Sequence, residues 1–210
     1  MGSLTLVRIV VSGTHASGKS TLIADFALQH PEYVVFTDPF DLVDETGAGL
    51  FSAQLRIAAD RLVEERDQRD VIAERGPLDF LAYLLAWSEL TSIPLEEEFL
   101  ERATLRTRRA LATIDLLVVL PLTARDAIHV SADEHVELRA AMNDALLDLL
   151  DDPDVVGEHL EVVELTGSPT ARVAALDALV ATHRTPSDRE PTLGARTHTP
   201  RARVECGFVH

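Results

Sequence analysis

The stretch with the clearest chemical character is Gly13–Ser20, which has the sequence GTHASGKS. It fits the pattern G-x-x-x-x-G-K-[ST] of a phosphate-binding loop without a departure. Glycines let such a chain wrap so that successive backbone N–H groups face phosphate oxygens. The Lys19 ammonium suits the β- and γ-phosphates, and the Ser20 hydroxyl suits Mg²⁺. We therefore predict a site for ATP and Mg²⁺ formed by Gly13, Ala16, Ser17, Gly18, Lys19, Ser20 and Thr21.

Lys19 is the only lysine in the chain of 210 residues, whose other basic side chains are arginines and histidines. A planar guanidinium is a poor replacement for a compact ammonium beside a triphosphate. The composition thus agrees with a site that requires an ammonium at this position. His15 lies in the middle of the loop, where we expect a spacer, with a nucleotide or substrate contact as the alternative.

Two carboxylates are expected near the loop because they follow short apolar segments. Asp38 comes after YVVFT, and Glu74 ends VIAE and is followed by Arg75. The carboxyl ends of parallel strands share one edge of a sheet, where ligands bind. We predict that Glu74 binds Mg²⁺, that Asp38 takes a proton from an attacking hydroxyl, and that Arg75 neutralises developing charge. The alternatives are a helix or turn cap for Asp38 and a solvated pair for Glu74 and Arg75.

The elements that must position these residues alternate between strand and helix. Apolar strands are predicted at Leu4–Ser12, Tyr33–Thr37, Val71–Ala73, Asp115–Leu120 and Leu160–Leu165. Helices are predicted at Lys19–Gln29, Phe51–Arg69, Pro77–Leu90, Pro94–Thr113, Asp133–Leu150 and Pro169–Thr182. This alternation indicates an α/β fold with a parallel sheet covered on both faces.

These motifs resemble those of the P-loop kinases, in particular deoxynucleoside kinases and the ribosylnicotinamide-kinase type. Asp38-Pro39 is similar to their carboxylate-proline pair, with Asp for the more usual Glu, and AERGPLDFLAYL is similar to their acid-arginine segment. The resemblance implies a three-layer P-loop NTPase fold with a five-stranded sheet in the order 2-3-1-4-5 and a helical lid region. It also implies that Asp79 and Tyr83 contact substrate. The alternative for Asp79 is a helix N-terminal carboxylate favoured by the helix dipole.

The same resemblance implies arginines that close over the phosphates. Arg125 and Arg139 are the lid candidates, and Arg172 is a candidate for stacking on adenine. The alternatives are pairing with nearby acids for Arg139 and a solvated helix position for Arg172. The sequence departs from the family because Arg125 is isolated and acids crowd the helix that follows it.

The overall composition limits the class of protein. The net charge of -16 disfavours nucleic-acid binding, because such a surface repels a phosphate backbone. The single cysteine, Cys206, makes no internal disulfide, and no apolar run is long enough to span a membrane. We expect a cytoplasmic protein with a P-loop kinase-like domain at 1–182, a disordered tail at 183–210, and a possible homodimer.

The function that these residues favour is transfer of the γ-phosphate of ATP to a hydroxyl or phosphate of a small nucleoside-like metabolite. A regulatory P-loop ATPase and a nucleotide-binding protein without catalysis are the alternatives. A guanine-specific N/T-K-x-D motif is excluded because the chain has no second lysine.

Overall fold

The chain folds around a parallel β-sheet. The computed structural model describes residues 6–38, 47–64, 70–122, 136–157, 159–184 and 202–205. In these ranges six strands lie in the order β2-β3-β1-β4-β5-β6, each parallel to its neighbours. The strands are β1 (Arg8–Ser12), β2 (Val34–Phe36), β3 (Val71–Glu74), β4 (Leu116–Val119), β5 (Glu161–Thr166) and β6 (Ala202–Glu205). The predicted order of the first five strands is confirmed.

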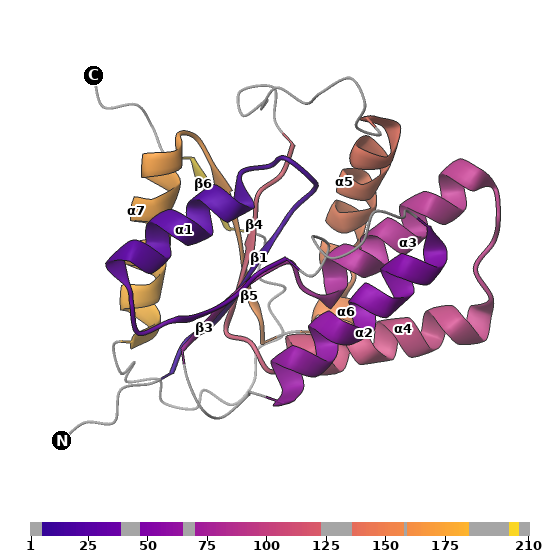
Figure 1. Ribbon diagram of the computed structural model, residues 1–210, viewed down its shortest axis with the longest axis horizontal. Coiled ribbons are helices and arrows are strands. Elements are labelled where there is room, and N and C mark those ends of the chain that lie inside the picture. Colours follow the sequence, from indigo (N-terminus) through magenta and orange to yellow (C-terminus); the bar gives the residue numbers. More distant parts are fainter. Residues whose placement is uncertain are drawn as a thin grey trace, which may run out of the picture.

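Helices cover both faces of the sheet, which confirms the predicted three layers. The helices are α1 (Lys19–Gln29), α2 (Ala48–Glu64), α3 (Pro77–Thr91), α4 (Glu97–Leu111), α5 (Val136–Leu150), α6 (Pro153–Val156) and α7 (Pro169–Arg184). Helices α1 and α7 lie on one face, and α2 to α5 lie on the other (Figure 1). No helix in the described ranges has the length and apolar character needed to cross a bilayer.

Strand β1 is central, and its side chains build both halves of the core. Successive side chains of a strand point to opposite faces of the sheet. Val10 therefore belongs to the core beneath α2 to α5, whereas Ile9 and Val11 belong to the core beneath α1 and α7. Because every residue of β1 is buried, this strand is a rigid base for the phosphate-binding loop that follows it.

The sequence missed the short helix α6 and some helix ends. Helix α2 begins at Ala48 rather than Phe51, and α4 begins at Glu97 rather than Pro94. Helix α6 has only four residues, which is too short for an apolar periodicity. The side chain of Asp152 caps it by accepting a hydrogen bond from the Asp154 amide at 2.8 Å.

The strand β6 is a correction to the predicted tail. It pairs with β5 from Ala202 opposite Val163 to Glu205 opposite Thr166, and α7 continues to Arg184. The expectation of disorder is therefore wrong for these residues. Strand pairing joins backbone groups at the edge of β5, and an argument from polar composition does not detect such pairing. The rest of the predicted tail lies outside the described residues.

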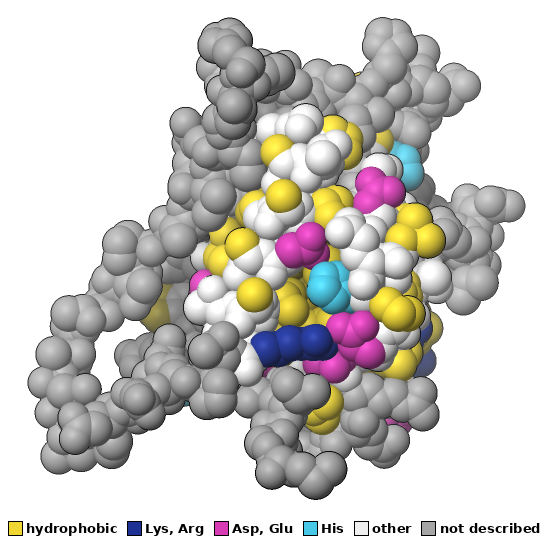
Figure 2. All heavy atoms as spheres, turned by 90° about the vertical axis from the view of Figure 1, so that its left-hand side faces the viewer, with side chains coloured by type: hydrophobic (Ala, Val, Ile, Leu, Met, Phe, Trp, Pro, Cys, Tyr) yellow, Lys and Arg dark blue, Asp and Glu magenta, His cyan; other side chains and the backbone are white. Residues whose placement is uncertain are grey.

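Charged side chains fasten α7 to the end of α1 and to the sheet, on the face that Figure 2 shows. The ring of His30 lies 3.0 Å from Asp177, measured between Nε2 and Oδ1. The Arg184 guanidinium pairs with Glu32 at 3.0 Å and with Asp70 at 3.1 Å. Exposed ion pairs contribute little individually. Together, however, they join three segments and fix the direction of α7, whose first turns face the phosphate-binding loop.

Candidate active site

The loop between β1 and α1 takes the wrapped shape that the sequence predicts. Gly13 has φ 149° and Gly18 has φ 92°, both in the region that favours glycine. A Cβ atom on Gly13 would lie 2.7 Å from the carbonyl oxygen of Leu120, so the turn has no room for a side chain. The loop therefore starts pressed against the end of β4, at the carboxyl edge of the sheet.

Asp79 anchors the start of this loop. Its carboxylate accepts hydrogen bonds from the Ser12 hydroxyl at 2.7 Å, the Gly13 amide at 2.9 Å and the Gly76 amide at 2.8 Å. The side chain is completely buried, and this burial raises the pKa of Asp79, opposed by Arg75 and by the hydrogen bonds. Both oxygens are engaged inside the protein. This geometry is that of the helix N-terminal carboxylate of the alternative, and the contact of Asp79 with substrate stays a prediction.

The carbonyl oxygens of the five residues 13–17 all accept hydrogen bonds from cationic side chains. The bonds are Arg75 to Gly13 (3.0 Å), Lys19 to Thr14 (2.7 Å), Arg139 to His15 (2.8 Å) and Ala16 (3.2 Å), and Arg172 to Ser17 (3.0 Å). In a trans peptide the N–H points away from the C=O of the same unit. The cations therefore occupy the carbonyl side of these peptides, and the amide side can bind an anionic ligand.

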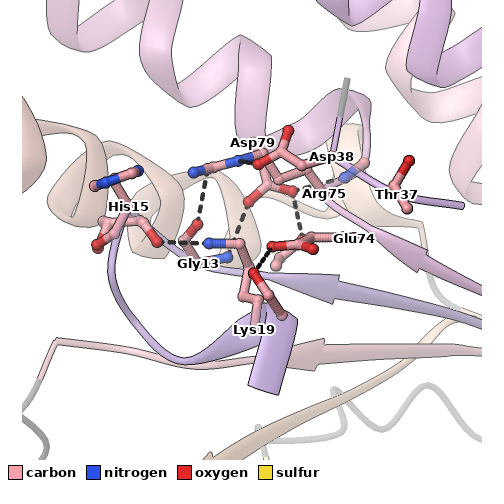
Figure 3. A network of polar contacts seen from close by, with 12 residues as sticks. Gly13, His15, Lys19, Thr37, Asp38, Glu74, Arg75 and Asp79 are labelled. Carbon is pink, nitrogen blue, oxygen red and sulfur yellow. Dashed lines mark hydrogen bonds and ion pairs between the residues drawn. The ribbon is translucent and has the colours of Figure 1, made fainter. Parts of the chain in front are cut away.

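Lys19 lies at the centre of the network in Figure 3. Its side chain is 4% exposed, and the ammonium donates to the Thr14 carbonyl. Burial, followed by the nearby Arg75, lowers the pKa of Lys19 to about 7, and Asp79, Glu74 and Asp38 oppose the shift. Because burial disfavours the charged form of Lys19, a ligand that brings negative charge stabilises this ammonium strongly.

Ser20 and Glu74 provide the oxygen ligands that Mg²⁺ prefers. The Ser20 hydroxyl donates to the Glu74 carboxylate at 2.6 Å, across the carboxyl edge of the sheet. The part of the chain that the structure describes contains no cluster of three or more His, Cys, Asp or Glu side chains that could hold a metal ion. The pair fits Mg²⁺ bound by one hydroxyl, one carboxylate through water, and phosphate oxygens, as is usual beside a phosphate-binding loop.

Asp38 and Arg75 form a short ion pair beside the loop. The Arg75 Nε lies 2.6 Å from the Asp38 carboxylate, while the guanidinium also donates to the Gly13 carbonyl. Arg75 is 3% exposed, and its backbone has φ 62°, a left-handed conformation that is uncommon outside glycine. Arg75 therefore connects the predicted general base to the first residue of the phosphate-binding loop, as Figure 3 shows.

Tyr83 lies behind this pair. Its ring stacks on Phe51 with centroids 5.0 Å apart, and the Arg75 guanidinium lies over it at 5.3 Å. Only 4% of Tyr83 is exposed, and its ring supports the Arg75 guanidinium. Its predicted contact with substrate stays a prediction.

The predicted lid arginines do not all lie in the described part of the chain. Arg139 and Arg172 both contact the loop backbone, from α5 and α7. Arg125 lies outside the described residues. Arg172 is buried rather than solvated, and Arg139 donates to the loop. The contact of Arg172 with adenine and the lid role of Arg139 stay predictions. The side chains of His15, in the loop, and Thr21, in the first turn of α1, are exposed.

Sequence reasoning missed Ser12, which donates to Asp79, and the anchoring role of the pair. A single polar residue at the end of the apolar segment RIVVS was the available signal. A second signal was Asp79 itself. It stands three residues after Gly76, the N-cap of α3, where an acidic side chain completes a capping box.

Comparison with known proteins identifies solved structures of similar fold. No protein-family model matches the chain, and no curated protein matches it. A deoxyadenosine kinase from M. mycoides matches with TM-score 0.63 and 13% identity, over 84% of this chain and 100% of that chain. Thymidylate kinase from Candida albicans matches with TM-score 0.59 and 19% identity, over 86% and 93% of the two chains. The YorR protein from Bacillus subtilis matches with TM-score 0.50 and 17% identity, over 83% and 96%.

These similarities, together with the strand order, show that the chain has the fold of the P-loop nucleoside and nucleotide kinases. The predicted resemblance is confirmed at the level of the fold. At identities of 13% to 19% the similarity shows the fold alone, and the chemistry must be argued from the site.

Proposed function

We propose that the protein is a small-molecule kinase that transfers the γ-phosphate of ATP to a hydroxyl or phosphate of a nucleoside-like metabolite. The observation that carries the proposal is the pairing of Asp38 with Arg75 beside the phosphate-binding loop. A protein that only binds nucleotide needs the loop and the Ser20–Glu74 pair. It has no need of a second carboxylate held at the same edge of the sheet.

Each residue of the site has a role in this proposal. Mg²⁺-bound ATP supplies the phosphoryl group, and the loop amides, Lys19 and Ser20 bind its phosphates and metal. Asp38 accepts the proton of the attacking hydroxyl, and its bond to Arg75 orients the carboxylate. Arg75 and Lys19 keep positive charge near the transferring group, where negative charge develops.

The nucleoside-like substrate is proposed from the fold and the site together. The structural relatives include kinases of deoxyadenosine and thymidylate by name, and their fold is shared over most of this chain. The carboxylate of Asp38 suits an alcohol acceptor, such as the 5′-hydroxyl of a nucleoside, because it can remove a proton from it. A homodimer and a cytoplasmic location stay predictions.

The test is acceptor-dependent release of ADP from Mg²⁺-ATP in a panel of nucleosides, nucleoside monophosphates and related alcohols. We expect release only with an acceptor, and a loss of at least about a hundredfold in Asp38→Asn, because general base catalysis contributes about 10² to 10⁴. Asp60→Asn is the matched control, since Asp60 is half exposed on α2 and pairs only weakly with Arg106 at 3.6 Å. A slow rate of ADP release that changes neither when an acceptor is added nor in Asp38→Asn would identify a regulatory ATPase instead.

A further inference from the structure

Ala16 has an unusual backbone conformation in the middle of the phosphate-binding loop. Its φ is 52°, in the left-handed region, although it carries a Cβ atom. For alanine this region is disfavoured by roughly tenfold relative to the right-handed and extended regions, whereas glycine enters it freely. Some interaction in the folded protein must therefore compensate for this conformation.

Arg139 makes the two bonds that are placed to compensate for it. Its Nε donates to the His15 carbonyl at 2.8 Å, and its Nη2 donates to the Ala16 carbonyl at 3.2 Å. The first carbonyl belongs to the peptide before the Ala16 Cα, and the second belongs to the peptide after it. Because φ and ψ describe the rotation of these two peptides about one Cα, a rigid guanidinium that binds both of them restrains both angles.

We propose that Arg139 is a positioning residue that holds the phosphate-binding loop in its binding-competent shape by fixing Ala16 in the left-handed conformation. The proposal rests on the proposed function only in so far as the loop binds a triphosphate. Arg139 acts through the loop backbone, whereas Lys19, Asp38 and Mg²⁺ contact the reacting atoms. A lysine cannot replace it, because an ammonium is a point charge without a planar fork.

Helix α5, which carries Arg139, is one of the helices that hold the phosphate-binding loop. Helix α5 packs along α3, and α3 carries Asp79, which anchors Gly13 at the start of the loop. Arg172 from α7 binds the Ser17 carbonyl near the other end. The loop is thus held from three different helices, and Arg139 holds its middle at Ala16, the non-glycine residue of the loop that has a positive φ.

The test is a double-mutant cycle of Arg139→Ala and Ala16→Gly, read by hydrogen exchange of the loop peptide in the ligand-free protein. Arg139→Ala should raise the exchange of the amides of residues 14–18 about fivefold or more, because alanine then leaves the left-handed region. In the Ala16→Gly background the same substitution should raise it by about twofold or less, since glycine carries no such bias. Arg139→Lys should behave like Arg139→Ala.

Two further measurements complete the experiment. Calorimetry with Mg²⁺ and a non-hydrolysable ATP analogue should give the same pattern, about tenfold weaker binding in Arg139→Ala and a smaller loss in the Ala16→Gly background. Thermal unfolding verifies that each variant folds. Arg102→Ala is the matched control, since Arg102 is an exposed arginine on α4 that pairs with Glu98, and it should change neither readout.

Two results would overturn the proposal. One is equal effects of Arg139→Ala in the alanine and glycine backgrounds, which would mean that Arg139 does not act through the left-handed conformation of Ala16. The other is no change in loop exchange in Arg139→Ala. If the wild-type protein binds no nucleotide, the proposed function fails, whereas the exchange cycle still decides whether Arg139 positions the loop.

Discussion

The buried charge of Lys19 makes the stability of the ligand-free protein depend on pH in an unusual direction. The pKa of Lys19 is about 7 in the folded chain and 10.5 in a solvated lysine. Between these values the unfolded chain binds more protons than the folded chain, so the free energy of unfolding rises with pH. Below pH 7 the ammonium is charged in both states, and its burial destabilises the fold. A solvated lysine would give no such rise.

The size of the effect follows from the shift. A difference of this size corresponds to about 5 kcal/mol at 1.36 kcal/mol per pH unit. Lys19→Met removes the charge but keeps an unbranched side chain in a site that is 4% exposed. At pH 6 we expect this variant to be more stable than the wild type by about 2–4 kcal/mol, less than the full shift because the bond to the Thr14 carbonyl is also lost. At pH 9 the difference should fall below about 1 kcal/mol.

Urea unfolding at pH 6 and pH 9 measures both differences, and amine labelling gives an independent value of the pKa. Because Lys19 is the only lysine, mass spectrometry separates its labelling from that of the N-terminal amine. The labelling rate of Lys19 should rise with a midpoint near pH 7. A midpoint near pH 10, or a Lys19→Met variant that is less stable than the wild type at both pH values, would refute the reasoning.

Three further substitutions probe the rest of the site. Glu74→Gln should raise the Mg²⁺ concentration for half-maximal activity by roughly tenfold, because Glu74 is the carboxylate partner of Ser20; an unchanged Mg²⁺ titration would contradict this assignment. Asp79→Asn should lower the free energy of unfolding by about 1–3 kcal/mol, since an amide cannot accept all three hydrogen bonds and leaves one buried donor unpaired; urea unfolding with no change would count against the anchor. Gly13→Ala should abolish measurable binding of Mg²⁺-ATP and destabilise the fold by about 1–3 kcal/mol, because its Cβ meets the Leu120 carbonyl; calorimetry that detects wild-type affinity would contradict the tight turn.

The fold was predictable because its signals are local. The buried strands are continuous apolar runs such as LLVV in β4, and α3 has a start signal in Pro77. The edge strand β6 was not predictable in this way. Its pairing with β5 depends on backbone groups that any sequence carries, and its polar composition favours no structure by itself.

The candidate site was predictable in its residue types and only partly in their contacts. The motif identified the loop, and the strand ends identified Glu74, Arg75 and Asp38. Spacing along the chain does not reveal that Arg139 reaches the carbonyl of His15 across 124 positions. It also does not distinguish a buried anchor from a substrate ligand at Asp79, since both require a carboxylate at the start of a helix.

Calorimetry of Mg²⁺-ATP binding to the wild-type protein at pH 8.5, in buffers of different ionisation enthalpy, tests the central claim most directly. We expect binding with uptake of about one proton, because the triphosphate holds Lys19 in its charged form and the pKa of Lys19 in the ligand-free protein is about 7. Lys19→Ala should lose most of the affinity, and AMP should not compete. If Mg²⁺-ATP does not bind, or if it binds equally well to Lys19→Ala, the loop is not a triphosphate site built around Lys19.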